Sequence, residues 1–180
     1  MRLYTPRLVL REFRPDDDAA VHAFASDPEV TRYTEWGPNT PADTEQFLQA
    51  AIQDAGTRPR TRFALAMVER ADDALIGSVE LCITSRARQQ ATTGYALAKR
   101  CWGRGLTTEA AAAMLRLGFD QLGLHKITAT CDPENAGSTR VLTKIGMHRE
   151  GHLRDHAFIR GAWQDRLLFA AIRPNTGPRT

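Results

Sequence analysis

Residues 100–107, with the sequence RCWGRGLT, constrain the fold of this chain more than any other segment. The pattern before them predicts a strand over 92–98, and the pattern after them predicts a helix over 107–121. Gly103 and Gly105 carry no Cβ atom, so the backbone can approach a ligand closely there. The first amides of the following helix lack intrahelical partners and point outward, which suits a phosphate or pyrophosphate. Positive charge lies beside the two glycines, at Arg100 and Arg104.

Two familiar phosphate loops fit this turn poorly. A Walker loop has Lys and then Ser or Thr after its last glycine, whereas Leu106 and Thr107 follow Gly105. A dinucleotide fingerprint needs a third small residue where this chain has Thr108. From the spacing alone, an anion-binding turn and a plain helix-capping turn therefore stay equally open.

Periodicity and turn signals predict one α/β domain over residues 1–172, followed by a frayed tail over 173–180. The order of elements favours a mixed sheet with helices on both faces. Thr40 and Pro41 are typical of a helix N-cap and first position. Strands are expected over 8–13, 63–69, 75–84, 92–98 and 125–131 and in a closing hairpin; helices are expected over 15–25, 41–55, 107–121 and 135–145.

Composition indicates a small cytoplasmic protein. Three widely spaced cysteines match neither a disulfide framework nor a zinc site, so no metal is expected. The net charge is +3 without a Lys/Arg run, and no apolar run approaches the ~18 residues of a membrane span. The start of the chain shows no secretory signal pattern. We expect a monomer or homodimer that binds neither nucleic acid nor membrane.

Arg100, Gly103 and Gly105 resemble the acetyl-CoA pyrophosphate loop of the GNAT acetyltransferase superfamily. That loop reads Gln or Arg, two residues, Gly, one residue, then Gly or Ala. The similarity runs from about residue 5 to residue 172 and is closest to the branch that acetylates protein N-termini, with type members acting on ribosomal proteins. It rests on TPRLVLR (5–11), GYAL (94–97), DPEN (132–135), Ser138, VL (141–142), KIGM (144–147), GHLRD (151–155) and GAWQD (161–165).

The resemblance implies a GNAT fold, in which a mixed, mostly antiparallel and splayed sheet of about seven strands is flanked by about four helices. It also implies an N-acetyltransferase that moves an acetyl group from acetyl-CoA to a primary amine by direct attack in a ternary complex. A protein N-terminus, a polyamine and an aminoglycoside-like amine stay open as acceptors, as does a CoA-binding regulatory module without catalysis. Together with the charge and free amides of this turn, the resemblance leads us to expect acetyl-CoA to bind at Leu97, Ala98, Arg100, Gly103, Arg104, Gly105, Leu106, Thr107 and Asn135.

Ser138 is the candidate that protonates the departing sulfur. It shares a helix face with Leu142 and Ile145, and it lies in the first helical turn, where the helix dipole favours an anion. The resemblance assigns the same role to the serine of Asn-x-x-Ser. The alternative is a serine that bonds its own helix backbone. Asn135 fits an N-cap, and in the family this residue also meets the pantetheine arm.

The general base is less defined. Related sequences often carry Glu two residues before the Gly-Tyr pair, where this chain has Thr92. Glu80 is the nearest alternative, and strand alternation places it with Ser78 and Cys82, opposite the apolar side chains. A solvated strand residue and a water relay stay open, because an α-amine has a pKa of about 7.7–8.0 and needs little help.

Substrate recognition is expected from Tyr33 and Trp36, in the loop between the first two helices, and from Asp155 in the closing hairpin. The family places this loop beside the acceptor, although aromatic side chains also serve simply to cover a core. Arg160 and Asp165 bind either an amine or peptide backbone, or pair across strands with Asp155. His148, His152 and His156 lack partners for a metal site and are interpreted as surface or substrate-groove residues.

Overall fold

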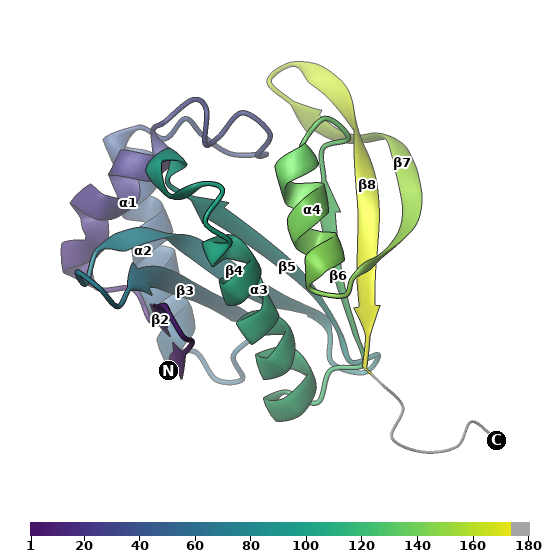
Figure 1. Ribbon diagram of the computed structural model, residues 1–180, viewed down its shortest axis with the longest axis horizontal. Coiled ribbons are helices and arrows are strands. Elements are labelled where there is room, and N and C mark those ends of the chain that lie inside the picture. The colour runs from purple at the N-terminus through teal and green to yellow at the C-terminus, as the bar shows by residue number, and fades with distance from the viewer. Residues whose placement is uncertain (174–180) are drawn as a thin grey trace.

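The computed structural model describes residues 1–173, in which eight strands form one sheet and four α-helices cover its two faces (Figure 1). This confirms the predicted mixed α/β class. The sheet has one strand more than the seven expected, because Arg2–Tyr4 forms an additional strand that pairs with the next one. The strands are β1 (Arg2–Tyr4), β2 (Leu8–Arg11), β3 (Arg62–Glu69), β4 (Leu75–Ser85), β5 (Gln90–Leu97), β6 (Lys126–Cys131), β7 (His148–Ile159) and β8 (Ala162–Ile172). The helices are α1 (Asp18–Ala25), α2 (Pro41–Gly56), α3 (Leu106–Arg116) and α4 (Ala136–Lys144).

The sheet order is β1-β2-β3-β4-β5-β6-β8-β7, and every neighbouring pair is antiparallel except β5 and β6. The parallel ladder joins only Gln90–Thr92 to Lys126–Thr128. Beyond it, β5 stays with β4 up to Leu97, while β6 stays with β8 up to Cys131. The two strands therefore separate into a fork, which confirms the splayed sheet.

Two apolar layers hold the fold together, one on each face of the sheet. Strand β3 contributes to both because successive side chains point to opposite faces. Leu65 and Met67 pack in the layer that includes α3, and Ala66 packs in the layer that includes α1 and α2. One face of α3 meets the sheet and is fully buried, at Leu106, Ala110 and Met114, which are spaced four residues apart.

Helix boundaries depart from the sequence prediction at two places. The first predicted helix begins as a 3-10 turn over Pro15–Asp17, where the Asp17 carboxylate accepts from the Arg14 amide and pairs with Arg11 at 2.7 Å. The helix predicted over 107–121 is α3 followed by a π-helical turn, Leu117–Gln121. Helix α2 begins as predicted, with the Thr40 side chain accepting from the Asp43 amide.

The C-terminal end of the described chain is tied to the sheet. The amide of Arg173 donates to the carbonyl of His125 at 2.8 Å, so this first residue of the predicted tail is not frayed. The rest of the predicted tail, 174–180, lies outside the described residues.

Candidate active site

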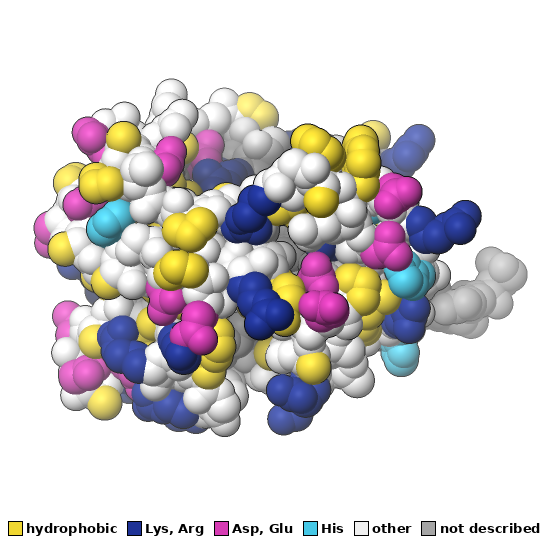
Figure 2. All heavy atoms as spheres, turned by 90° about the horizontal axis from the view of Figure 1, so that it is seen from above, with side chains coloured by type: hydrophobic (Ala, Val, Ile, Leu, Met, Phe, Trp, Pro, Cys, Tyr) yellow, Lys and Arg dark blue, Asp and Glu magenta, His cyan; other side chains and the backbone are white. Residues whose placement is uncertain are grey.

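The fork between β5 and β6 opens into a cleft of about 1610 Å³. Its walls include residues 94–97 of β5, residues 129–131 of β6, the start of α4 and the loop between α1 and α2. In Figure 1 that loop arches over the sheet toward α4 and the tip of the β7–β8 hairpin. Figure 2 shows the same end of the molecule from above, where Lys and Arg side chains lie beside a furrow in the surface.

Backbone groups of β5 line the fork. Ala98 was expected to bind acetyl-CoA, but its amide donates to the Ile76 carbonyl at 2.8 Å and is not free for a ligand. Because backbone groups alternate between the two edges of an antiparallel strand, the amides of Tyr95 and Leu97 face the fork. The Leu97 carbonyl accepts from Trp102 Nε1 at 2.8 Å, which joins the end of β5 to the glycine loop.

The glycine loop exposes its backbone at the start of α3. Gly103 and Gly105 both have φ of +75°, a left-handed conformation that L side chains rarely adopt. A Cβ at Gly103 would meet no atom within 4 Å, so the backbone there is open to a ligand. Gly105 is the N-cap of α3, and Thr107 and Thr108 of its first turn line the cleft. The loop therefore fits a pyrophosphate at a helix N-terminus.

The loop is clamped by arginines and carboxylates. The Arg104 guanidinium pairs with Glu69 at 2.6 Å and therefore stabilises the loop. Arg104 is not part of the cleft lining. Arg7 donates to the Arg104 carbonyl at 2.8 Å and pairs with Glu109 of α3, also at 2.8 Å. The opening segment of the chain thus fixes the glycine loop. Arg100 is exposed, with no polar partner in residues 1–173.

Ser138 faces the fork and forms a hydrogen bond with Tyr95, a residue that was not predicted from the sequence to take part in the site. Its Oγ lies 2.8 Å from the Tyr95 hydroxyl, across the cleft between α4 and β5. Burial raises the pKa of Tyr95, partly offset by its hydrogen bond to Ser138, so the phenol stays protonated. Asn135 Oδ1 accepts from the Ser138 amide at 2.9 Å, the predicted N-cap. The Gly-Tyr pair marked Tyr95, but nothing in the sequence showed its reach to α4.

Glu80 lies on the predicted face of β4, because its neighbours Val79 and Leu81 are fully buried while the Glu80 side chain is 40% exposed. Its carboxylate pairs with Arg62 at 3.1 Å, and Arg62 also pairs with Asp54 of α2 at 3.1 Å. Across the ladder stands Gly94, which has no side chain to cover the carboxylate. Glu80 is therefore oriented toward the cleft by an ion pair.

The cysteines near the cleft remain thiols. Burial, and then the Glu80 carboxylate, raise the pKa of Cys82 to about 11. Burial also raises the pKa of Cys131, against hydrogen bonds from Thr139 and Ser138. A protonated thiol is a poor nucleophile, so neither cysteine is prepared to carry an acyl group.

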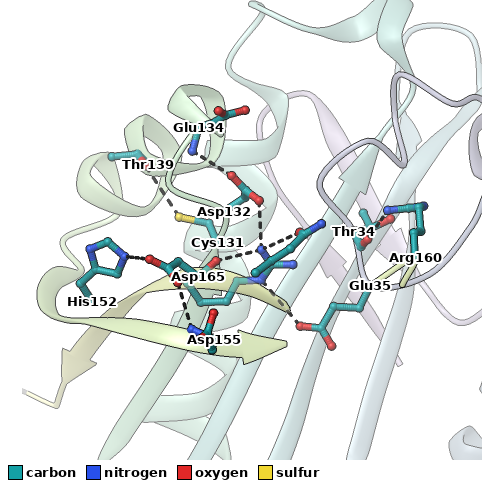
Figure 3. Close-up of polar contacts among 12 residues, drawn as sticks. Thr34, Glu35, Cys131, Asp132, Glu134, Thr139, His152, Asp155, Arg160 and Asp165 are labelled. Carbon is teal, nitrogen blue, oxygen red and sulfur yellow. Dashed lines mark hydrogen bonds and ion pairs between the residues drawn. The ribbon is translucent and has the colours of Figure 1, made fainter. Parts of the chain in front are cut away.

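Tyr33 and Trp36 both line the cleft, and Trp36 keeps 41% of its surface exposed, unlike a core aromatic. The loop that carries them is held by Arg160, the guanidinium of which donates to the carbonyl oxygens of residues 31, 34, 36 and 37. Figure 3 shows Arg160 beside Thr34 of this loop. Arg160 therefore binds peptide carbonyls of its own chain.

Asp155 is not part of the cleft lining. Its amide donates to Asp165 Oδ1 at 2.9 Å, and His152 contacts Asp165 at 2.6 Å (Figure 3). The Asp155 amide, and then His152, lower the pKa of Asp165. These contacts brace the β7–β8 hairpin across its strands, which was one of the two readings of this group.

Arg166 and Asp132 line the cleft without having been singled out from the sequence. Arg166 is 2% exposed, and its Nη1 donates to Asp132 Oδ2 at 3.0 Å. Asp132 also accepts from the Glu134 amide at 2.8 Å, in the turn before α4. Asp132 belongs to the DPEN segment, but its ion-pair partner, Arg166, lies 34 residues later in the sequence. No local pattern therefore indicated this pair.

Within residues 1–173, no cluster of three or more His, Cys, Asp or Glu side chains is placed to hold a metal ion. None of the helices in that range is both long and apolar enough to cross a membrane.

Known proteins share this architecture and sequence. Residues 7–148 match the family model described as an acetyltransferase (GNAT) domain. An uncharacterized N-acetyltransferase of Bacillus licheniformis, p20, is 31% identical over 172 residues, which cover 95% of this chain and 96% of the relative. The ribosomal protein uS5-alanine N-acetyltransferase of Escherichia coli is 33% identical over 85 residues, 47% of this chain and 44% of that protein.

A solved structure extends the similarity to a CoA complex. Mycobacterium smegmatis RimJ, in complex with CoA-disulfide, superposes with a TM-score of 0.81 at 26% identity, over 93% of this chain and 86% of that chain. The sequence and the fold of this chain are therefore similar to those of known acetyltransferases. The chain belongs to the GNAT acetyltransferase family and is an N-acetyltransferase that uses acetyl-CoA.

Proposed function

We propose that this enzyme acetylates the free amino terminus of a protein substrate by direct attack on acetyl-CoA in a ternary complex. The observation that carries the proposal is the pair of hydroxyls at the fork, Ser138 and Tyr95, 2.8 Å apart between the glycine loop and the loop that holds Tyr33 and Trp36. Acetyl-CoA supplies the thioester. Residues of this chain hold both substrates and move the protons.

Ser138 donates a proton to the departing sulfur. Its place in the first turn of α4 adds the field of the helix N-terminus, which stabilises negative charge there. Tyr95, kept protonated by burial, donates to Ser138 Oγ as the serine gives up its own proton. The amides of Leu97 and of the first turn of α3 hold the pantetheine arm and the pyrophosphate, and Gly103, Gly105, Leu106 and Thr107 shape that pocket.

Glu80 accepts the proton from the amine, directly or through a water molecule. Its ion pair with Arg62 orients the carboxylate at the cleft wall. Because Cys82 and Cys131 stay protonated, the acetyl group passes straight to the amine, without an acyl-enzyme.

A protein N-terminus is favoured as the acceptor for two reasons. The relative from Escherichia coli acts on an alanine of ribosomal protein uS5. The acceptor side of the cleft also combines aromatic side chains, Tyr33 and Trp36, with polar ones, as a peptide requires.

The three cysteines of the enzyme are free thiols, which suits the reducing cytoplasm, where we place the reaction.

Free-thiol release from acetyl-CoA with a panel of amines tests the acceptor class. The panel contains short peptides with free N-termini, the same peptides with blocked N-termini, a polyamine and an aminoglycoside. We expect turnover with the free peptides alone. Faster turnover with the polyamine or the aminoglycoside would assign the enzyme to small amines instead.

A further inference from the structure

Arg166 has a buried guanidinium nitrogen that the fold does not use. The side chain is 2% exposed and lies at the cleft, at the start of β8. Its Nη1 donates to Asp132 Oδ2 at 3.0 Å and to the Asp165 carbonyl at 3.1 Å. Its Nη2 is buried and has no hydrogen-bond partner among the described residues. A charged donor left unsatisfied in a protein interior is costly and calls for an explanation.

The surroundings of Arg166 indicate which kind of atom this donor meets. Asp132, with 14% of its side chain exposed, and Glu35, at 3.9 Å from Arg166 Nε, are both carboxylates. Two negative groups around one positive group repel a phosphate. They suit a ligand that carries an ammonium group beside an oxygen, because the carboxylates meet the ammonium while Nη2 meets the oxygen.

The loop between α1 and α2 contacts Arg166 through Glu35. Glu35 belongs to this loop, its side chain is 62% exposed, and its contact with Arg166 is long. Figure 3 shows Glu35 reaching from the loop toward the group around Asp132 and Asp165. The Glu35 carboxylate can turn from Arg166 to the ammonium of a ligand at little cost, because a long, partly exposed ion pair contributes little stability.

We infer that Arg166 Nη2 binds a carbonyl or carboxylate oxygen attached next to the amine-bearing carbon of the acceptor. This inference rests on the proposed function, since it takes the cleft beside Tyr33 and Trp36 as the acceptor site. It defines the acceptor chemically as a peptide N-terminus or an α-amino acid, and it excludes polyamines, which have no such oxygen. Arg166 is then a specificity residue that touches substrate.

A merely structural role for Arg166 has a different signature. Through Asp132 it also fixes the turn before α4, so its loss would disturb Ser138 and lower the activity toward all acceptors alike. Selectivity between two ligands that differ by one oxygen separates the two roles.

The test is calorimetric and needs no turnover. An alanine tripeptide amide and its (E)-alkene isostere, in which the first peptide carbonyl is absent but the chain geometry is kept, are titrated into the enzyme saturated with CoA. We expect the tripeptide amide to bind about 10- to 100-fold more tightly, the usual value of a hydrogen bond from a charged group. Free alanine, as a third ligand, distinguishes a carboxylate from a peptide carbonyl.

The variant Arg166→Lys keeps a positive charge for Asp132 but has no second guanidinium nitrogen. We expect its preference for the tripeptide amide over the isostere to fall close to one, with CoA affinity and melting temperature near wild type. Arg166→Met combined with Asp132→Asn removes the whole pair and should show the same loss. Arg154→Lys, an exposed arginine on the neighbouring strand β7, is the matched control and should keep the preference.

Equal binding of the two peptides to the wild-type enzyme, or an unchanged preference in Arg166→Lys, would overturn the inference. Binding of free alanine, without binding of the tripeptide amide, would support the contact but assign its oxygen to a carboxylate. A wild-type enzyme that shows the predicted binding preference yet never acetylates peptides would refute the proposed function and leave the Arg166 contact in place.

Discussion

The two walls of the cleft are built in different ways. The wall that we propose for CoA, called the CoA wall, is one continuous segment, residues 97–108, that runs from the end of β5 through two left-handed glycines into α3. The wall that we propose for the acceptor, called the acceptor wall, gathers a loop over 31–37, a strand residue at Glu80, and the pair of Asp132 and Arg166. One wall is local in sequence, and the other exists only after the sheet has formed.

An arginine holds each wall, but the two arginines act on different structures. Arg7 supports the CoA loop through the Arg104 carbonyl and pairs with Glu109 of α3. Arg160 supports the acceptor loop through carbonyl oxygens alone. The CoA loop would keep its turn without Arg7, because the glycines favour it, whereas the acceptor loop depends on contacts over 120 residues away in sequence. Changes on the first wall should therefore affect CoA or kcat, and changes on the second should affect the acceptor.

Ser138→Ala should have the largest effect. If Ser138 protonates the sulfur, kcat falls by about 10²-fold or more, with KM for acetyl-CoA nearly unchanged. Thr143→Val is the matched control, because the Thr143 hydroxyl on the same helix bonds only its own backbone. Steady-state kinetics with a peptide acceptor measures both. A wild-type kcat in Ser138→Ala would leave Ser138 as a helix residue only.

Glu80→Gln tests the base on the acceptor side. We expect kcat/KM to fall by up to about 10²-fold at neutral pH, and the loss to shrink at alkaline pH, where the amine is already neutral. Asp54→Asn removes the other partner of Arg62 without touching the cleft and should leave the pH profile unchanged. Superimposable profiles for Glu80→Gln and wild type would assign the proton to solvent.

Gly105→Val tests the backbone geometry of the CoA wall. A side chain at φ of +75° is strained, so the variant should lose stability by about 1–2 kcal/mol and bind acetyl-CoA at least about tenfold more weakly. Gly123→Val has a similar positive φ of +66° outside the cleft and should lose stability without losing affinity. Calorimetry measures the affinity for acetyl-CoA, and thermal melting measures the stability of the fold. Equal CoA affinity in both variants would remove the loop from its assigned role.

Arg160→Met should loosen the acceptor loop and leave the CoA wall intact. We expect KM for the peptide to rise by about tenfold, because several backbone hydrogen bonds from one charged group are lost. The dissociation constant of CoA should not change. Arg149→Met, at an exposed position of β7, the strand that leads to Arg160, serves as the control. A matching loss of CoA affinity would show that the two walls are coupled.

Tyr95→Phe should have the smallest effect, a fall in kcat of about fivefold, since it removes the contacts of the phenol with the Oγ and the carbonyl oxygen of Ser138 but retains the serine. Because the pKa of Tyr95 is raised above its usual value of about 10, its titration should not appear in the rate profile below that pH. A new ionisation near pH 9 that disappears in Tyr95→Phe would contradict this.

The sequence by itself determined the CoA wall and the layers of the fold. Gly103 and Gly105 mark a left-handed turn because other residues avoid it, and the spacing of Leu106, Ala110 and Met114 fixed which face of α3 meets the sheet. Asn135 at the start of α4 was equally local, since an N-cap bonds an amide only three residues away. These features depend on backbone preference and periodicity, which a single segment carries.

Only the tertiary structure decided the acceptor wall and the partners of the reacting groups. The bond from Tyr95 to Ser138, the pair of Arg166 and Asp132, and the hold of Arg160 on the loop each join elements between 34 and 129 residues apart. The occupied amide of Ala98 and the bound guanidinium of Arg104 were likewise decided by neighbours distant in sequence. A side chain acquires such a partner only when the sheet places both at one edge, and no periodicity along the chain records which strands will meet.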